Sequence, residues 1–558
     1  MRNKLLKWGR VVVSLLFLTV LTWAFLDFSG SLSVALVNGF TWVQFIPSLL
    51  NFLTLFGLAA TGFVVVMAVT LIYGRVYCST VCPLGVLQDV ISSFSKFYTA
   101  KIRKRRNRYR PSEPQNLLRY SILAVTVLFF LFGSVFFLNL LDPFSLFGKI
   151  FSGLVRPVYY GANNLLADVF QSFGNYRFYH VETRSQTLLP LVFPALMLGV
   201  LLWLAFSRGR LYCNTVCPVG TFLGFLSRYS MYRIEIDDAL CNHCAKCSLN
   251  CKAECIDLKS NEIDFSRCVG CFNCLNVCSK QGIGYKNKWF SSEQKAEEKE
   301  EKPLIATGNE TMFSSDPKEN DAGRKGFLFQ LVAYVFGYAA ASRALRSDAF
   351  AQDMERRDDL DVVVTQPSTI PENKNFAVSP PGSKSLKHFT DTCTACQLCV
   401  SVCPTRVLQP SFLEYGFSGM MQPRLDFHAS FCNFDCIACT EICPTGAILP
   451  LTVEEKHVAQ IGVVRLELDN CVVKVEGTAC GACAEHCPTQ AVRMVPYQDG
   501  LTIPEIVPEQ CIGCGACEYI CPTRPYRAIY IDGNKVHAQA VPPEIEKLDF
   551  EPDDDFPF

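Results

Sequence analysis

The sequence predicts a polytopic α-helical membrane bundle fused to two small α+β domains built on cysteine-rich loops. Half of the residues are hydrophobic and only 19% are charged, and the charges lie almost entirely outside a few long apolar runs, as expected for a chain that crosses a membrane several times. Of 29 cysteines, 28 fall into spaced groups, which is too regular for scattered core thiols. A chain of 558 residues also exceeds a single core, so several domains are expected.

Four apolar runs are long enough to cross a membrane: residues 9–27, 50–73, 118–141 and 187–206. The segment 31–47 is also apolar. If it crossed as well, the basic loop after Tyr73 would move to the opposite side, so we expect a re-entrant or interfacial piece there. The membrane domain is thus expected to comprise residues 1–235 with four spanning helices.

Basic residues predict the orientation of this bundle, because Lys and Arg in short loops stay on the cytoplasmic side. The N-terminus and the loop 101–110 are strongly basic, the loop 142–186 is sparse in basic residues, and Arg208 and Arg210 follow the fourth helix. We therefore expect the first cysteine-rich domain, residues 236–286, in the cytoplasm. The basic loop lacks interleaved aromatics and a binding fold, so no nucleic-acid partner is expected.

The second half of the chain follows a polar linker, residues 287–322, which has too little apolar content to form a core. Residues 323–351 begin with Arg324 and Lys325, continue through an uncharged stretch and end at Ala349-Phe350-Ala351. This is the layout of an export signal inside the chain, with a fifth transmembrane helix as the alternative. A linker (352–383), the second cysteine-rich domain (384–540) and an acidic tail (541–558) follow, and export would carry the second domain out of the cytoplasm, with cleavage after Ala351 left open.

Six groups of four cysteines have the spacing of [4Fe–4S] ligands, with three thiolates on one loop and a fourth cysteine after three intervening residues. Zinc ribbons need neither this fourth cysteine nor the proline that follows it in four groups, and disulfide frameworks suit short secreted domains. We therefore expect six [4Fe–4S] clusters. The six groups are Cys241, Cys244, Cys247 and Cys251; Cys268, Cys271, Cys274 and Cys278; Cys393, Cys396, Cys399 and Cys403; Cys432, Cys436, Cys439 and Cys443; Cys471, Cys480, Cys483 and Cys487; and Cys511, Cys514, Cys517 and Cys521.

In the first domain, the fourth cysteine of each group is expected to reach the cluster of the other group. One cluster would then be held by Cys241, Cys244, Cys247 and Cys278, and the other by Cys268, Cys271, Cys274 and Cys251. Cys255 is left over. We interpret it as a buried thiol beside a cluster rather than as a ligand.

The membrane domain contains an internal repeat, in which Gly74-Arg75-Val76-Tyr77-Cys78 through Cys82-Pro83 corresponds to Gly209-Arg210-Leu211-Tyr212-Cys213 through Cys217-Pro218. Two cysteines four residues apart share one helix face. Facing each other across a pseudo-twofold axis, Cys78, Cys82, Cys213 and Cys217 could supply four thiolates to one metal site or form two redox-active pairs. A structural role, in which each proline opens a surface helix, stays open.

The four-group pattern, including Cys432-x3-Cys436-x2-Cys439-x3-Cys443-Pro444, resembles the NapG-type iron–sulfur subunit of the periplasmic nitrate reductase quinol dehydrogenase. Four helices followed by a bacterial-ferredoxin-like domain are similar to its NapH-type membrane partner, and Arg324-Lys325 is similar to a twin-arginine signal with lysine in second place. The resemblance implies one electron route in a bacterial inner membrane, here fused into one chain. It also implies that the first and fourth groups, and the second and third, exchange their last cysteines.

The expected function is that of a quinol dehydrogenase module, which draws on the quinone pool and passes electrons to a c-type cytochrome or periplasmic reductase. Quinol oxidation releases protons, so a proton acceptor is needed near the headgroup. The candidates are Asp142, His180 and Glu182, with ordinary loop residues as the alternative reading. An accessory electron donor for the assembly or maintenance of a respiratory metalloenzyme is the rival function. A Cys-x-x-Cys-His motif does not occur, so c-type haem would belong to a partner.

Overall fold

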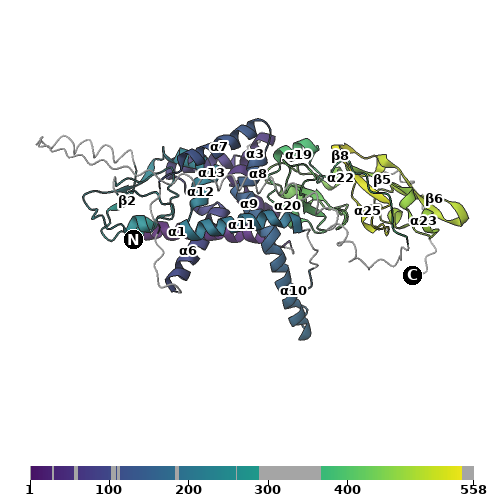
Figure 1. Cartoon of the computed structure of the whole chain (residues 1–558), viewed down its shortest axis with the longest axis horizontal. Helices are drawn as coiled ribbons and strands as arrows, with labels where there is room; N and C mark the ends of the chain where they lie inside the picture. The colour runs from purple at the N-terminus through teal and green to yellow at the C-terminus, as the bar shows by residue number, and fades with distance from the viewer. Residues whose placement is uncertain are drawn as a thin grey trace, which may run out of the picture.

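The computed structural model describes residues 2–27, 30–55, 61–101, 109, 113–181, 188–258, 261–287 and 366–542. The segment 323–351, where an export signal or fifth helix is expected, lies outside these ranges, as do Glu182 and the tail beyond residue 542. The described chain forms three parts in a row, with a helical bundle between two cysteine-rich domains (Figure 1).

The first half of the bundle contains a long helix, a bent pair of short helices and the first cysteine motif. Its elements are α1 (Arg2–Leu26), α2 (Val34–Trp42), α3 (Phe45–Leu55), α4 (Gly62–Tyr73), α5 (Tyr77–Thr80) and α6 (Pro83–Lys101). The axes of α2 and α3 meet at 99°, which fits the re-entrant piece expected for 31–47. The single span expected over 50–73 is wrong, because this segment is divided between α3 and α4. A Cβ on Gly62 would lie 1.9 Å from the Trp42 carbonyl oxygen, so α4 begins in close contact with the end of α2.

The second half begins with a broken helix, where 118–141 was expected to form one span. Gly133, at φ 80°, lies in the turn between α7 (Asn116–Leu131) and α8 (Phe136–Leu141), and this backbone conformation interrupts the helix. The segment 142–186 was expected as a loop, but its described part, residues 142–181, is mostly helical. Asp142 caps α9 (Pro143–Ile150) and accepts a hydrogen bond from Ser145 N at 2.8 Å, an N-terminal signal followed by proline at the first helical position.

The remaining elements of the second half are η2 (Phe151–Val155), α10 (Arg156–Ser172), α11 (Leu188–Arg208), α12 (Leu211–Thr215) and α13 (Pro218–Ser227). All residues of α9 are buried, so a segment expected outside the bundle lies in its core. By contrast, α10 extends sideways from the bundle, across the long axis of the molecule (Figure 1).

The repeat seen in the sequence is also present in three dimensions. In the first half, the Tyr77 hydroxyl donates to Gln44 Oε1 at 3.1 Å, at the break between α2 and α3. In the second half, the Tyr212 hydroxyl donates to the Leu141 carbonyl oxygen at 3.2 Å, at the break between α8 and α9. Each tyrosine of a Tyr-Cys motif thus contacts the tip of a broken helix pair.

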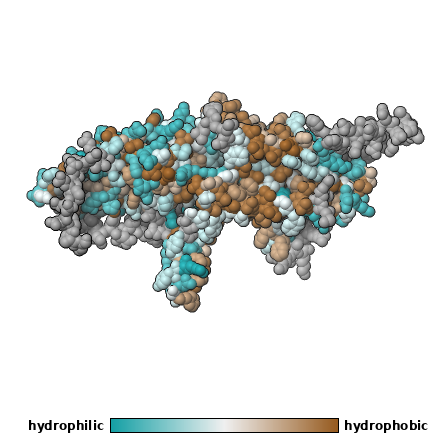
Figure 2. Space-filling view, turned by 180° about the vertical axis from the view of Figure 1, so that it is seen from behind, coloured by the Kyte–Doolittle hydropathy of each residue, from teal (hydrophilic) through white to brown (hydrophobic). Residues whose placement is uncertain are grey.

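The surface of the bundle is apolar. Figure 2 shows hydrophobic residues gathered over the bundle between two more hydrophilic ends, and side chains such as Leu16, Leu128 and Trp203 are exposed there. Among the described residues, Lys4–Leu26 and Pro190–Arg208 are long and apolar enough to cross a membrane, and the bent α2–α3 pair would make a third crossing. The described chain is therefore mostly helical in this part, with two or three candidate spans.

The first cysteine-rich domain is a small α+β unit at one end of the bundle. Strands β1 (Tyr232–Ile236) and β2 (Ile283–Asn287) pair antiparallel around the short helices α14 (Lys246–Leu249) and α15 (Asn273–Val277). Arg75 Nη1 donates to the Ser266 carbonyl oxygen at 2.9 Å, and the Tyr109 amide donates to the Leu249 carbonyl oxygen at 3.2 Å. These contacts attach the domain beside the first cysteine motif.

The second cysteine-rich domain packs against the opposite end of the bundle (Figure 1). It contains three antiparallel strand pairs, β3–β4, β5–β8 and β6–β7. Its elements are α19 (Leu386–Thr392), α20 (Leu398–Val402), β3 (Leu408–Pro410), β4 (Pro423–Leu425), α21 (Ala438–Ile442), α22 (Val453–His457), β5 (Ala459–Leu466), η3 (Leu468–Asn470), α23 (Val472–Glu476), α24 (Ala482–Glu485), β6 (Val492–Pro496), η4 (Gln498–Gly500), β7 (Thr502–Ile506), η5 (Pro508–Gln510), α25 (Ala516–Ile520) and β8 (Ile529–Gln539).

Polar contacts and one glycine join this domain to the bundle. Arg156, which is 7% exposed, donates to the carbonyl oxygens of Val400 at 3.1 Å and Ser401 at 2.6 Å, near the end of α20. A Cβ on Gly148 would lie 2.0 Å from the Cys396 carbonyl oxygen. The first cysteine loop of the second domain therefore lies directly against α9.

Candidate iron–sulfur sites

The cysteine loops share a backbone feature that depends on their spacing. In the four groups with the regular spacing, the residue two positions before the third cysteine is left-handed: Ala245, Phe272, Gln397 and Gly515 have φ between 57° and 80°. In the two groups with stretched spacing, Ile437 and Gly481 occupy this position with φ of −115° and −128°. The stretched groups keep two residues before the third cysteine, and their longer insertion lies between the first and second cysteines. The longer insertion there therefore accompanies the loss of the left-handed turn.

In the first domain, the structure brings the two groups together as their spacing predicts. One small cavity is lined by Cys251 together with Cys268, Cys271 and Cys274, the set expected for the second cluster. Cys255 lines the same cavity, with its sulfur 3.5 Å from that of Cys251. It is 3% exposed.

Cys255 corresponds in position to small or apolar residues of the other groups, which are alanines in two of them. It follows the fourth cysteine of its group by four residues, as Ala447 follows Cys443 and Ala491 follows Cys487, and both alanines are buried. This correspondence fits a packing thiol rather than a ligand.

In the second domain, the expected exchanges between the first and fourth groups and between the second and third groups are both wrong. Neighbouring groups exchange their last cysteines instead. Cys443 lies with Cys393, Cys396 and Cys399, and Cys403 lies with Cys432, Cys436 and Cys439. Cys521 lines one cavity with Cys471, Cys480 and Cys483, and Cys487 lies with Cys511, Cys514 and Cys517.

The connections between groups explain this pairing. The β3–β4 pair joins the first group to the second, and the β6–β7 pair joins the third to the fourth. In the first domain, an isolated antiparallel bridge between Ile256 and Ile263 occupies the same place. An antiparallel connection folds two consecutive groups face to face, so each group reaches its neighbour in the sequence.

The thiol sets of the second domain form a row that leads away from the bundle. The set of Cys396 touches α9, as described above. The set that contains Cys439 is its neighbour, because the two sets exchange Cys403 and Cys443. The Cys432 amide, in the set of Cys439, donates to the Cys514 carbonyl oxygen at 2.9 Å. This hydrogen bond joins the set of Cys439 to the set that contains Cys517. The set of Cys483 follows, because Cys487 and Cys521 are exchanged crosswise between the last two sets.

The spacing of the sulfurs disfavours mononuclear zinc. A tetrahedral Zn²⁺ with bonds of about 2.3 Å requires sulfurs ~3.8 Å apart. Among the described residues, which include every cysteine, no three cysteine sulfurs lie mutually within 4.8 Å, and all 29 thiols are free. Wider sets suit polynuclear clusters, whose ligands are bonded to different iron atoms.

The four cysteines of the membrane repeat lie close together in the bundle and are 2–3% exposed. Cys82 lies within electrostatic range of the sulfurs of Cys78, Cys213 and Cys217. The Gln88 amide donates to Cys213 Sγ at 3.2 Å, and the Gly220 amide donates to Cys217 Sγ at 3.3 Å. The structure thus brings the two Cys-x3-Cys-Pro motifs into one site.

Two arginines of this site were not singled out from the sequence as functional. Arg75 Nη2 donates to the Cys213 carbonyl oxygen at 3.2 Å, and Arg210 Nη1 donates to the Cys78 carbonyl oxygen at 2.7 Å. The signal was present in the sequence, because both copies of the repeat contain Gly-Arg before the Tyr-Cys motif.

Asp142 and His180, the two described residues among the three proposed for proton uptake, lie in different surroundings. Asp142 is 1% exposed and serves as the N-cap of α9, so it is not at an outer rim. His180 is exposed, with Nε2 2.9 Å from Asp168 Oδ1. Glu182 lies outside the described residues.

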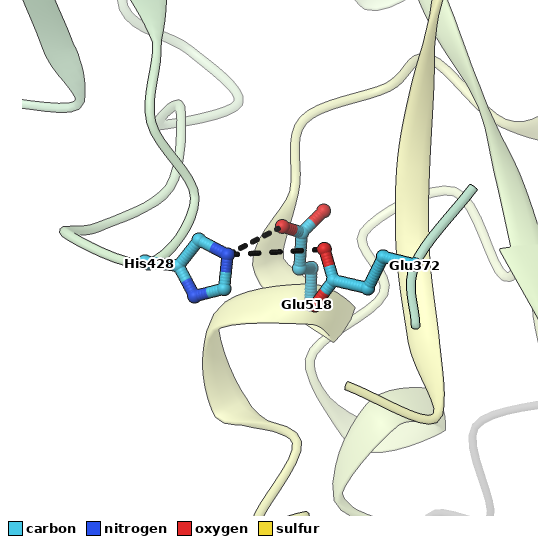
Figure 3. A group of neighbouring side chains, drawn as sticks. All are labelled: Glu372, His428 and Glu518. Atoms are coloured by element: carbon cyan, nitrogen blue, oxygen red, sulfur yellow. Dashed lines mark ion pairs between the residues drawn. The ribbon is translucent and has the colours of Figure 1, made fainter. Parts of the chain in front are cut away.

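Among the described residues, Glu372, His428 and Glu518 are the one group of ligand-type side chains close enough to share a metal ion (Figure 3). The Lys374 ammonium already lies between the two carboxylates, 3.0 Å from Glu372 and 2.5 Å from Glu518. Although burial lowers it, the pKa of Lys374 is raised by these carboxylates. Burial raises the pKa of the Glu518 carboxyl. The group is best described as an ion-pair network that attaches the segment before α19 to α25.

Comparisons with known proteins match the membrane cysteine motifs and the second cysteine-rich domain to 4Fe-4S domains. A model described as a 4Fe-4S binding domain matches residues 55–106 and 189–233. Models described as a 4Fe-4S dicluster domain match residues 392–448 and 478–524. The first match contains all eight cysteines of the first pair of groups, and the second contains those of the other pair except Cys471. No solved structure matches the chain.

Curated relatives match parts of the chain. The uncharacterized protein MJ0749 of Methanocaldococcus jannaschii is 33% identical over 16% of this chain and 36% of its own length. The ferredoxin-type protein NapF of Escherichia coli is 27% identical over 24% of this chain and 74% of its own, and the ferredoxin-type protein NapG of the same organism is 29% identical over 30% and 63%. The chain thus covers less than two thirds of MJ0749 and of NapG. The matched domains and the cysteine geometry together lead to one conclusion: this chain is an iron–sulfur electron transfer protein of ferredoxin type that binds several [4Fe–4S] clusters and is distantly related to NapF, NapG and MJ0749.

Proposed function

We propose that the chain is a membrane-bound quinol dehydrogenase module, which takes electrons from quinol in the bundle and relays them through [4Fe–4S] clusters to a periplasmic c-type cytochrome or reductase. In this proposal the 24 cysteines of the six groups are the cluster ligands, and the chain is a fusion similar to NapH-type and NapG-type subunits. The observation that carries it is the row of thiol sets that begins at α9 and leads away from the bundle. Such a row suits stepwise transfer of single electrons, since transfer rates fall steeply with distance.

The row also matches what a two-electron donor requires. Quinol loses two electrons and two protons on oxidation, whereas a [4Fe–4S] cluster accepts one electron at a time. Several clusters in sequence let the two electrons leave the quinol one after the other. His180 with its partner Asp168 is the remaining candidate for proton uptake among the described residues.

The proposed membrane orientation has the first domain in the cytoplasm and the second in the periplasm. Helix α1 supports it. Near its start, Arg10 forms an ion pair with Asp89 at 3.0 Å, and near its end Phe25 packs beside Gly148, against the second domain. At 1.5 Å per residue these positions are about 22 Å apart along the helix. This distance is most of the thickness of a membrane's hydrocarbon core, which is ~30 Å.

The test of the function is direct reduction by quinol. Oxidised protein purified in detergent under anaerobic conditions is mixed with a water-soluble quinol, and the loss of cluster absorbance is followed in a stopped-flow instrument. Rapid bleaching of most clusters is expected. Clusters that stay oxidised with quinol but reduce with dithionite would refute the dehydrogenase and favour the accessory electron donor.

The orientation is tested separately, with protease added to intact spheroplasts. Release or digestion of the 384–540 domain, with the 236–286 domain intact, is expected. Protection of both domains until the membrane is broken would place all six clusters in the cytoplasm.

A further inference from the structure

The membrane thiols form a site that is nearly symmetric. Besides the reciprocal arginine contacts, a Cβ on Gly85 would lie 2.2 Å from the Cys78 carbonyl oxygen, and a Cβ on Gly220 would lie 2.3 Å from that of Cys213. Both glycines let the backbone of the following helix approach its own motif. The same Cβ positions lie 3.7 Å from Arg210 Nη1 and 3.0 Å from Arg75 Nη2, so each glycine also leaves room for the arginine of the other motif.

The surroundings of the thiols contain more positive than negative charge. Asp89 is shared by three buried cations, with Arg210 at 2.7 Å, Arg10 at 3.0 Å and Lys252 at 3.4 Å. Arg75 is 1% exposed and forms no ion pair with a carboxylate in the part of the chain that the structure describes. A buried cation without a counter-charge is costly.

Thiolates supply this counter-charge. Arg75 lies within electrostatic range of Cys268 in the first domain and of the membrane cysteines Cys213 and Cys217. Arg75 Nη2 lies 3.8 Å from Cys78 Sγ, and its other partners are neutral: Asn214 Oδ1, at 3.2 Å, and the carbonyl oxygens of Cys213 and Ser266. Four thiolates around a [4Fe–4S] core carry a net charge of about −2 in the oxidised state, because the core itself carries about +2. A cluster at this position would face Arg75 and Arg210, which also lie within electrostatic range of Cys268 and Cys271 of the first domain, respectively.

The match to a 4Fe-4S binding domain points to the same residues. Its two segments, 55–106 and 189–233, contain Cys78, Cys82, Cys213 and Cys217 and no other cysteine. These sulfurs also share the wide spacing of the other sets, since no three of them lie mutually within 4.8 Å. A single zinc ion does not fit this spacing.

We propose that Cys78, Cys82, Cys213 and Cys217 hold a seventh [4Fe–4S] cluster, which connects the cluster sets of the two domains. On one side, Val76 lies beside Gly270, within the group of Cys271, with 3.1 Å between Val76 Cγ2 and a Cβ placed on that glycine. On the other side, the Tyr212 hydroxyl contacts Leu141, which immediately precedes the α9 helix that touches Cys396. A single electron passes through, and the neighbouring cluster that donates it is oxidised as the seventh is reduced. No bond is formed or broken.

The test is the iron and acid-labile sulfide content of the full chain, which does not depend on quinol as the donor. At four irons per cluster, the wild type is expected to contain about 28 irons, against about 24 without the seventh cluster. The variant C82A/C217A is expected to lose about four irons and as many sulfides, and the remaining clusters show that it folds. S79A is the matched control, because it removes a buried side-chain oxygen from the same motif but no thiol.

Three results would overturn the proposal. These are about 24 irons in the wild type, an unchanged iron content in C82A/C217A, or a loss of two irons, which would mean a binuclear centre. If the double variant does not accumulate, the wild-type content decides, together with the number of one-electron reductions in a redox titration followed by electron paramagnetic resonance. Seven are expected.

Discussion

Replacing Arg156 by methionine should loosen the second cysteine-rich domain from the bundle. Arg156 is buried at this junction and donates to two carbonyl oxygens of α20, those of Val400 and Ser401. Hydrogen bonds from a charged donor contribute about 1.5–3 kcal/mol each, and methionine supplies no donor while keeping most of the apolar volume. The docked state should therefore lose about 3 kcal/mol or more, which is on the order of a hundredfold in the docking equilibrium.

Hydrogen–deuterium exchange in lipid nanodiscs measures this change directly. Peptides covering α20 and α9 should exchange on the order of a hundredfold faster in R156M, because opening of the junction exposes their amides. Peptides from the first domain should not change. R177M is the matched control, since Arg177 is an exposed arginine farther along the same segment. Unchanged exchange in α20 of R156M would refute the reasoning that these two hydrogen bonds hold the junction.

Three further predictions concern the cluster domains. C251A should lose about four irons and C255A none, measured by a colorimetric iron assay. Equal losses would mean that Cys255 is a ligand. Burial lowers the pKa of His537 to about 4 from about 6.5 in an unfolded chain, so the second domain loses stability as the pH falls from about 6.5 to about 4, by at most about 2 kcal/mol at pH 5. On heating at pH 5, H537Q should therefore lose its cluster absorbance at a higher temperature than the wild type, whereas at pH 8 it should not. An equal difference at both pH values would contradict a lowered pKa of His537. K374M leaves the buried Glu518 without its cation, which costs about 3 kcal/mol or more. Cluster absorbance should therefore be lost at a lower temperature than in a control variant, K387M, which changes an exposed lysine of α19. Identical curves would show that the network does not stabilise the fold.

The spacing of cysteines was sufficient to predict the two small α+β domains, because ligand spacing is set by local loop geometry. Their internal pairing was not predictable for the second domain. Which last cysteine reaches which set depends on the connecting strands, and β3 and β4 have only three residues each, too few to give a periodic signal. The hydrophobic runs of the bundle marked α1 and α11 correctly, since these are long continuous helices.

Hydropathy failed where helices break inside apolar sequence. The segments 50–73 and 118–141 are apolar throughout, so composition cannot locate the interruptions after α3 and α7. The burial of α9 was missed for a different reason. Asp142 and Lys149 suggested an external loop, whereas the structure uses Asp142 as a helix cap, and Lys149 Nζ bonds to the Asn139 side chain and carbonyl oxygen inside the bundle.

The reciprocal contacts of Arg75 and Arg210 bear on how the bundle is assembled during synthesis. Arg75 finds its hydrogen-bond acceptors mainly in residues 213–266, and Arg210 finds its own in residues 78 and 89. When the first half enters the membrane, Arg75 lacks most of its hydrogen-bond acceptors. The acceptors of Arg210 in the first half do not yet have this donor. The first half is therefore an incomplete intermediate that becomes stable only when α11 and α12 arrive, and premature release of a truncated chain would expose it to proteolysis.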